Sequence, residues 1–351
     1  MAPDEPTLLS PNAMTPAQTF RIVFMGTPDF AVPSLHALIE NGFEVVAVVT
    51  QPDKPRGRGK ALKPSPVKLA AFTHHLPVLQ PVKVREPGFL QEIASLQPDL
   101  IITAAFGQIL PQALLDIPKI MPINVHGSLL PRYRGAAPIQ WALINGETST
   151  GITIMRMDAG MDTGPILLQR SLEIGPEETF GELYARMAVL GAETLLEALK
   201  LLAAGNLKPV EQPAEGVSLA PPITPELAWL DWRKPVEDLA NLMRALDPKP
   251  GACSSLNGVT MRLFRPAVVS GLRPASLSSD TSAGPLSGPA VSGTVLSCDE
   301  RGLLVACGQD GRSALLVREI LAPGKRRMRV ADYMRGNSIP AGSVFGRQTI
   351  E

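Results

Sequence analysis

The sequence is poor in cysteine, with only Cys253, Cys298 and Cys307 and no Cys-x-x-Cys pair. This spacing excludes a disulfide framework and a cysteine-based zinc ribbon, and it is typical of a reducing compartment. No apolar run approaches the ~18–20 residues of a membrane helix. Residues 1–19 contain two acids and no lysine or arginine, unlike a signal or transit peptide. We therefore expect a disordered tail at 1–19 on a cytoplasmic protein with no membrane partner.

A net charge of either sign is also lacking, because 33 basic residues balance 33 acidic ones in 351 residues. The apolar fraction of 45% is globular, and the length predicts two domains. Residues 1–205 hold 16 basic and 19 acidic side chains, whereas the remainder holds 17 and 14. The neutral sum thus excludes a uniformly basic protein but allows a basic second domain.

A dinucleotide-binding fingerprint, Gly-x-Gly-x-x-Gly, is missing as well. The first strand-to-helix turn carries only Gly26, followed by Pro28 and Asp29, which suit a helix start. We interpret it as a structural turn, which argues against a nicotinamide-dependent dehydrogenase.

Strand-like segments nevertheless alternate with helix-like segments from residue 21 onward. Continuous apolar runs predict strands at 21–25, 44–50, 99–106, 121–125, 151–156 and 165–174. Helical patterns occupy 30–41, 66–75, 88–96 and 179–204. This alternation predicts an α/β fold, a Rossmann-like, doubly wound and mostly parallel sheet, in a first domain at 20–206. Ligands of such sheets bind beyond the carboxyl ends of the strands.

The composition changes after residue 206. Five prolines predict a linker at 207–225. A helix is expected at 236–246, and short strands follow at 259–264, 293–297, 303–306 and 314–320. They predict a small C-terminal β-barrel of the OB type at 226–340. A Ser-, Pro- and Gly-rich insertion at 271–292 is expected to be a disordered loop, and 341–351 a tail.

The densest cluster of chemically useful residues starts at Asn124-Val125-His126-Gly127, at the end of a predicted strand. Residues two apart on a strand point to the same side, so Asn124 and His126 should share a face. An asparagine can donate to a developing oxyanion, and a histidine can transfer a proton near neutral pH. The structural alternative is a buried core histidine with a capping asparagine.

A loop at 157–164 offers two acids, Asp158 and Asp162, and two glycines between predicted strands. A carboxylate near His126 would orient its ring and stabilise its cation. The alternative is an ordinary Asx-turn. The spacing does not choose between the two acids.

Two segments are basic. Residues 51–63 carry Lys54, Arg56, Arg58, Lys60 and Lys63 against a single acid. Residues 312–335 have seven basic side chains, among them Lys325, Arg326 and Arg327. Both predict contacts with a polyanion, and the alternative for each is a solvated surface.

Three motifs carry a resemblance to a known family: Asn-Val-His-Gly-Ser-Leu-Leu-Pro at 124–131, Arg-Gly-Ala-Ala-Pro at 134–138 and Met-Asp-Thr-Gly at 161–164. Residues 21–204 resemble the folate-dependent formyltransferases. The segments 24–30 and 51–60, with Asp231-Trp232 and Gly324-Lys325, are similar to members that act on methionyl-tRNA. The resemblance spans about 20–340. Phe106 stands where the family often has tyrosine.

The resemblance implies that 10-formyltetrahydrofolate donates a formyl group to the methionine α-amine of initiator methionyl-tRNA, for translation initiation. It implies a catalytic trio of Asn124, His126 and Asp162, and so favours the second acid. It places folate beside Ser128, Leu129, Leu130, Pro131, Phe106 and Gly107. The tRNA contacts would be Lys54, Arg56, Arg58, Lys60, Lys325, Arg326 and Arg327. No metal is implied, and a monomer is expected.

Two alternatives accompany this interpretation. A formyltransferase for a small amino sugar or nucleotide would leave the basic run of the second domain unexplained. A non-catalytic tRNA-binding protein would not need Asn124, His126 and Asp162.

Overall fold

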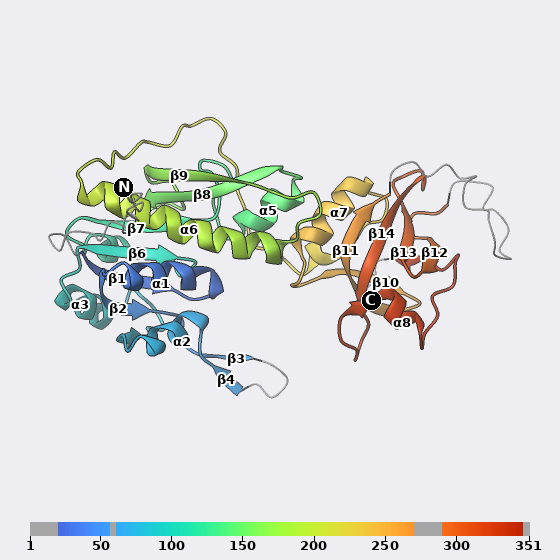
Figure 1. Ribbon diagram of the computed structural model, residues 1–351, viewed down its shortest axis with the longest axis horizontal. Helices are drawn as coiled ribbons and strands as arrows, with labels where there is room; N and C mark the ends of the chain where they lie inside the picture. Colours follow the sequence, from blue (N-terminus) through green and yellow to red (C-terminus); the bar gives the residue numbers. More distant parts are fainter. Residues whose placement is uncertain (1–19, 57–60, 270–289, 347–351) are drawn as a thin grey trace, which may run out of the picture. The chain divides into compact units, whose positions relative to one another are not determined.

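The computed structural model describes residues 20–56, 61–269 and 290–346 (Figure 1). The expected tail at 1–19, the side chains of Arg58 and Lys60, and most of the expected insertion lie outside the described residues. The chain divides into two compact units. The first unit comprises Met1–His126, Ile154–Gly160 and Gly191–Val210, and the second comprises Gly127–Thr153, Met161–Leu190 and Glu211–Glu351. We describe each unit in turn.

A seven-stranded sheet has the order β5-β2-β1-β6-β7-β8-β9. Its strands are β1 Arg21–Gly26, β2 Glu44–Val49, β5 Val78–Leu79, β6 Leu100–Ala104, β7 Met121–His126, β8 Ser149–Arg156 and β9 Ile166–Glu173. The five strands from β5 to β7 run parallel. The chain leaves β1 toward β2 and β5, then continues on the other side of β1 with β6 and β7. This reversal between β1 and β6 is the switch point at which doubly wound sheets bind ligands.

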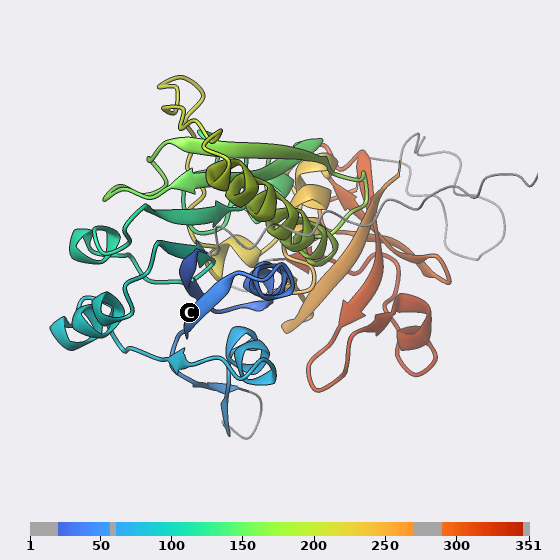
Figure 2. The ribbon, with the colours of Figure 1, turned by 60° about the vertical axis from the view of Figure 1, so that its left-hand side comes forward.

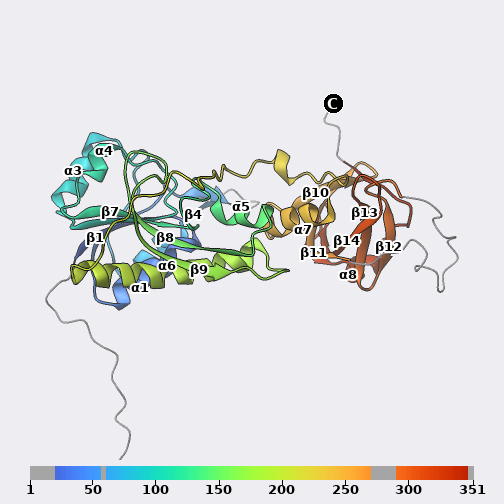
Figure 3. The same cartoon turned by 90° about the horizontal axis from the view of Figure 1, so that it is seen from above.

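Both faces of the parallel strands in the first unit are buried. On one face, strand residues pack against α3 (Pro87–Ser95) and α4 (Gln112–Leu115), and the cluster includes Val23, Met25, Ile101, Phe89, Ile93 and Leu114. Helix α1 (Val32–Glu40) lies on the opposite side (Figure 3). Two covered faces explain why these strands read as continuous apolar runs.

The basic segment of the first unit is a hairpin rather than a plain loop. Strands β3 (Lys54–Arg56) and β4 (Ala61–Lys63) pair antiparallel in a separate two-stranded sheet. The hairpin projects away from the parallel strands (Figures 1 and 2). Helix α2 (Pro66–Thr73) follows, and the Ser65 hydroxyl caps it by accepting from the Lys68 backbone N–H at 3.0 Å.

Helix α6 (Phe180–Ala203) begins in the second unit with a cap supplied by the Glu182 carboxylate. The Glu182 carboxylate accepts hydrogen bonds from the Thr179 backbone N–H at 2.9 Å and from the Thr179 hydroxyl at 2.7 Å. Thr-x-x-Glu is a capping-box sequence, and here its glutamate binds the Thr179 backbone N–H; the helix begins at Phe180, one residue after the expected start. Helix α5 (Pro138–Ile144), also in the second unit, starts with a proline at its first position.

The C-terminal part of the second unit is a curled antiparallel sheet of order β12-β13-β14-β11-β10-β16. The strands are β10 Ala252–Leu256, β11 Val259–Val268, β12 Val295–Asp299, β13 Gly302–Cys307, β14 Ser313–Leu321 and β16 Phe345–Gly346, and the short β15 Met328–Arg329 pairs with β14. A bridge between Thr294 and Val344 joins the two ends of this order, so the sheet closes on itself. Helices α7 (Val236–Ala245) and α8 (Val330–Met334) pack on it (Figure 2).

The expected fold class is confirmed: a Rossmann-like sheet is followed by a small antiparallel barrel. Each strand expected from an apolar run is present, with ends that differ by a few residues. The sequence interpretation missed short elements, among them β3, β4, β5, α4, α5, β10, β15, α8 and β16.

Candidate active site

Asn124 and His126 both lie at the carboxyl end of β7 in the first unit. The side-chain oxygen of Asn124 accepts a hydrogen bond from the Thr103 hydroxyl at 2.7 Å. Thr103 is the register partner of Asn124 on β6 and is only 3% exposed. Since the hydroxyl proton occupies the amide oxygen, the amide N–H₂ is directed away from Thr103. Asn124 therefore presents a donor, which is the group that an oxyanion requires.

His126 is the last residue of β7 and is 5% exposed. Its two-residue spacing from Asn124 on an extended strand gives the two side chains the same side of the sheet, as expected. A buried imidazole next to a fixed amide donor can add a second hydrogen bond to a developing negative charge or exchange a proton.

The two acids of the 157–164 loop differ in what they bind. Asp158 accepts a hydrogen bond from the Gly160 backbone N–H at 3.0 Å, which is an Asx-turn. Asp162 instead accepts from the Gly135 backbone N–H at 2.8 Å, within the second unit. Its own backbone is left-handed, with φ of 54°. The Asx-turn alternative thus describes a contact of Asp158, and the placement of Asp162 beside His126 stays a prediction.

The segment predicted to contact folate, Ser128–Pro131, is tied down through its backbone. Thr153 donates from its hydroxyl to the Ser128 carbonyl at 2.6 Å and accepts from the Leu130 N–H at 3.1 Å. Gln169 donates to the Leu130 carbonyl at 2.9 Å. The Ser128 hydroxyl donates to the Arg132 carbonyl at 2.7 Å, so this side chain serves the turn itself. The segment is a rigid wall, and its contact with folate stays a prediction.

Phe106 and Gly107 lie in the loop after β6. The Phe106 ring is 4% exposed and belongs to the core under α3 and α4. Its carbonyl accepts from the Thr27 hydroxyl at 2.9 Å. Gly107 has φ of 87°, and Ile109 is 91% exposed. Phe106 thus forms a fixed apolar base for the loop, and its contact with folate, like that of Gly107, stays a prediction.

The base of the basic hairpin is held by Asp53. Its carboxylate accepts from the Lys68 ammonium and from the Gln80 amide, each at 2.8 Å. These two donors, Lys68 first, lower the pKa of Asp53. The single acid of the basic segment is therefore a structural anchor, while Lys54 and Arg56 stand in β3 as the hairpin begins.

The three basic residues predicted for the C-terminal tRNA contact differ from one another. Lys325 and Arg326 are exposed in the turn before β15. The Arg327 guanidinium pairs with Asp247 at 2.5 and 3.0 Å and with Glu319 at 2.6 Å, and it lies 4.2 Å from the centre of the Phe264 ring. Arg327 thus stabilises the barrel through these contacts. Its contact with tRNA stays a prediction.

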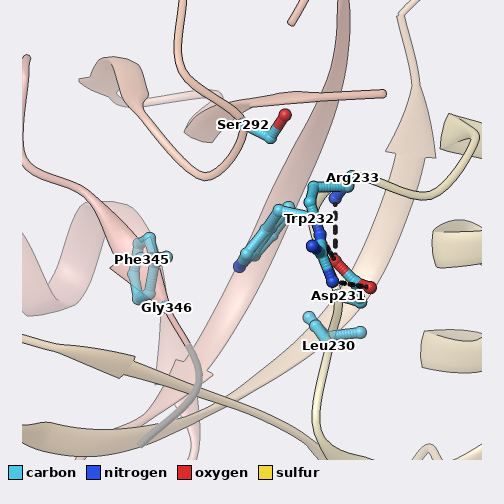
Figure 4. Close-up of a pocket in the computed structure, with 7 residues that line it drawn as sticks. All are labelled: Leu230, Asp231, Trp232, Arg233, Ser292, Phe345 and Gly346. Atoms are coloured by element: carbon cyan, nitrogen blue, oxygen red, sulfur yellow. Dashed lines mark hydrogen bonds and ion pairs between the residues drawn. The ribbon is translucent and has the colours of Figure 1, made fainter. Parts of the chain in front are cut away.

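A hollow of about 240 Å³ on the barrel contains the Asp231-Trp232 pair that contributed to the resemblance (Figure 4). The Trp232 indole N–H donates to the Ser254 hydroxyl at 3.0 Å, and its ring lies 6.0 Å from that of Phe345. Asp231 pairs with Arg233 at the rim. These contacts give Trp232 a role in barrel packing, whereas Asp231 makes a local ion pair at the surface.

The proline-rich segment predicted as a linker is hydrogen-bonded to the residues that follow the 124–131 motif. The Tyr133 N–H donates to the Ser218 hydroxyl and the Arg134 N–H to the Ser218 carbonyl, each at 2.9 Å. The Ala220 N–H donates to the Arg134 carbonyl at 2.7 Å. A Cβ on Gly135, whose φ is 122°, would come within 2.8 Å of the Ala220 carbonyl oxygen. We call residues 212–221 the strap.

Sequence reasoning missed Thr103, Thr153 and Gln212. Thr103 sits inside an apolar run, and only the pairing of β6 with β7 brings it to Asn124. Gln212 sits in the strap, where composition alone predicts a linker. Among the residues that the structure describes, no group of three or more His, Cys, Asp or Glu side chains could hold a metal ion, and no helix is long and apolar enough to cross a membrane.

Two family models match the chain. The model described as formyl transferase matches residues 20–199, and the model of the formyl transferase C-terminal domain matches residues 222–338. Together they confirm the resemblance drawn from the motifs.

Known proteins are similar over nearly the whole length. The methionyl-tRNA formyltransferase of Citrifermentans bemidjiense is 48% identical over 93% of this chain and 97% of its own. That of Ruminiclostridium cellulolyticum is 46% identical over 93% and 100%.

Solved structures share the fold at lower identity. An N-formyltransferase from Helicobacter canadensis, in complex with folinic acid and dTDP-3-aminofucose, has a TM-score of 0.61 at 19% identity, over 85% of this chain and 99% of its own. Methionyl-tRNA formyltransferase from Clostridium thermocellum has a TM-score of 0.51 at 16% identity, over 72% and 95%. Because family models and close relatives cover both the sheet and the barrel, the chain belongs to the formyl transferase family.

Proposed function

We propose that this protein transfers the formyl group of 10-formyltetrahydrofolate to the α-amino group of methionine on initiator methionyl-tRNA. The product is N-formylmethionyl-tRNA for translation initiation. The observation that carries the proposal is the 46–48% identity to methionyl-tRNA formyltransferases over at least 97% of their length. The N-formyltransferase from Helicobacter canadensis is similar at 19% identity, which supports a shared fold and no shared substrate.

The reaction needs a donor for an oxyanion. The neutral methionine amine attacks the formyl carbon, a C–N bond forms, and the carbonyl oxygen becomes negative. The N–H₂ group of Asn124 and the protonated ring of His126 donate to that oxygen. The support for Asn124 is the Thr103 hydroxyl on its amide oxygen, which leaves the amide nitrogen as the group presented.

The tetrahedral intermediate then collapses. The bond from the formyl carbon to N10 of the folate breaks, and the proton lost by the amine is returned to N10. We assign Asp162 to hold His126 and to assist this proton transfer. The carboxylate is itself fixed by the Gly135 N–H, which supports an orienting role for Asp162.

Folate is a substrate here, and the residues proposed to receive it are Ser128–Pro131 with Phe106 and Gly107. This proposal is supported by the hydrogen bonds with which Thr153 and Gln169 hold the backbone of Ser128–Pro131. Rigid walls lower the cost of orienting a bound donor.

We assign the tRNA contacts to the basic hairpin, with Lys54, Arg56, Arg58 and Lys60, and to Lys325 and Arg326. The exposure of Lys325 and Arg326 and the anchored base of the hairpin support this assignment. A formyltransferase for a small amine would have no use for either basic region.

The test is single-turnover formylation of charged initiator tRNA by His126→Ala. We expect the rate to fall on the order of 10²–10⁴-fold while tRNA affinity stays within about twofold, because only a proton-transfer and oxyanion donor is removed. The matched control is His36→Ala, a histidine on α1, which should keep the wild-type rate. Wild-type turnover by His126→Ala would contradict the mechanism, and formylation of free amino sugars but not of methionyl-tRNA by the intact protein would contradict the substrate.

A further inference from the structure

The side-chain amide of Gln212, at the start of the strap, uses its whole hydrogen-bonding capacity. Its N–H₂ group donates to the carbonyl of Asp162 at 2.8 Å and to the carbonyl of Gly164 at 2.7 Å. Its oxygen accepts from Nε of Arg134 at 3.1 Å and from a terminal nitrogen of the same guanidinium at 2.7 Å. An amide has two donors and two acceptor sites, so all four are engaged. All these residues belong to the second unit.

The two carbonyls that Gln212 binds belong to the loop that carries the Asp162 carboxylate. Asp162 has a left-handed backbone, which side-chain-bearing residues disfavour. The donors of Gln212 hold the peptide group that follows Asp162 and the one that follows Gly164, and so stabilise that backbone. Without them, two carbonyl oxygens would lose their partners and the loop could relax to an ordinary conformation.

Gln212 also connects this loop to the Arg134–Gly135 turn by a second route. The first connection is the Asp162 carboxylate on the Gly135 N–H at 2.8 Å. The second runs from the Asp162 and Gly164 carbonyls through the Gln212 amide to the Arg134 guanidinium. Two connections to adjacent residues fix both the position and the rotation of the carboxylate, which one alone would not do.

We propose that Gln212 is a positioning residue for formyl transfer, which holds the Asp162 loop in the conformation that the reaction requires. The inference rests on the proposed function, because it needs Asp162 to take part in catalysis. Gln212 acts through Asp162 and Arg134. Within the strap, the residue that serves the Asp162 loop is Gln212, whereas Ser218 binds the backbone of residues 133 and 134.

The chemistry of an amide allows a selective test. Gln212→Glu keeps the shape and the acceptor for Arg134 but replaces the N–H₂ donor with a carboxylate oxygen, which faces two carbonyls and repels them. Gln212→Met keeps the length and removes both functions. Ser218→Ala is the matched control, since it removes the strap's bond to the Tyr133 N–H and leaves the Asp162 loop untouched.

The experiment measures kcat and KM for formyl donor and charged tRNA from pH 5 to 9, with thermal unfolding of each full-length variant. We expect Gln212→Glu and Gln212→Met to lose on the order of 10-fold in kcat, with both KM values within about twofold, because misplacing a catalytic group costs rate. The deficit of Gln212→Glu should shrink as the pH falls, since a protonated carboxyl donates one hydrogen bond; that of Gln212→Met should not. Ser218→Ala should keep its kcat even if its unfolding temperature drops.

Wild-type kcat in Gln212→Glu at all pH values would overturn the inference, and so would an equal loss of kcat in Ser218→Ala. Asp162→Asn, measured alongside, separates the two proposals. If Asp162→Asn loses activity and Gln212→Glu does not, only the positioning role is wrong. If Asp162→Asn turns over like the wild type, the role of Asp162 in the proposed mechanism is wrong, and the positioning role with it.

Discussion

At the scale of single residues, the direction of the Asn124 amide depends on Thr103. The Thr103 hydroxyl makes its shortest hydrogen bond, at 2.7 Å, to the Asn124 side-chain oxygen, against 3.3 Å to the Ile123 carbonyl and to the Met157 sulfur, and this bond favours presentation of the amide nitrogen. Thr103 is also buried, so water cannot replace it easily. The hydrogen bond therefore fixes the orientation of the Asn124 amide before the reaction, so that little side-chain entropy is lost in the transition state.

Thr103→Val should lower kcat by roughly fivefold to tenfold, because one hydrogen bond stabilises the required orientation by about 1 kcal/mol. The valine has nearly the same shape, and burying it should leave the unfolding temperature close to that of the wild type. Thr103→Ser keeps the hydroxyl and should keep most of the rate. Steady-state formylation measures both variants, and an unchanged kcat in Thr103→Val would show that the orientation of Asn124 has another source.

The candidate site residues differ in how far the sequence reveals them. Asn124 and His126 are predictable, because a strand of period two that ends in polar residues places them on one side of a sheet edge. Thr103 is not, because its contact depends on the register between β6 and β7, which no local pattern encodes. The pairing of Arg327 is not predictable either, since a basic run does not reveal that one of its members contacts the buried Asp247.

At the scale of elements, the start of α6 joins two parts of the second unit. Glu182 caps the helix through Thr179 and also pairs with Arg265 of β11 at 2.8 Å. The Arg265 hydrogen bond is the largest cause that lowers the pKa of Glu182 to about 2. One carboxylate thus fixes a helix boundary and the approach of a barrel strand.

Glu182→Gln should destabilise the protein by about 1 kcal/mol at pH 7, the size of a helix cap combined with an exposed, solvent-screened ion pair. The folded pKa lies below the ordinary value near 4.5, so this stabilisation is present above that pH and is lost as the pH falls toward 2. Urea unfolding at several pH values should therefore give curves for variant and wild type that converge in acid. Glu193→Gln, exposed on the same helix, serves as the control. A difference that persists to pH 2 would contradict the assignment.

Long elements were predictable and short ones were not. Continuous apolar runs predicted the parallel strands, since burial on both faces leaves few polar positions in them. Strand β5 has two residues and helix α5 seven, too few for a periodic pattern to stand out. The strap has prolines that exclude helix and central strand, yet its backbone pairs with 133–137, which is a long-range contact that composition does not encode.

At the scale of the whole molecule, a formal charge of zero is compatible with a polyanionic substrate. The basic side chains are concentrated in the hairpin at 54–63 and in the run at 312–335, and acids elsewhere balance them. Binding to a phosphate backbone depends on the local groups that displace counterions rather than on the sum of charges.

The number of proposed tRNA contacts can be measured from the salt dependence of tRNA affinity. Each lysine or arginine that contacts a phosphate contributes about one to the slope of log affinity against log salt concentration, so Arg58→Ala should reduce that slope by about one, and Lys325→Ala combined with Arg326→Ala by about two. If both regions contact the same tRNA, the triple variant should lose about three, because the counterions displaced by separate phosphates add. Arg85→Ala, an exposed arginine outside both regions, should leave the slope unchanged. If the triple variant keeps the wild-type slope of log affinity against log salt concentration, tRNA binds through other residues.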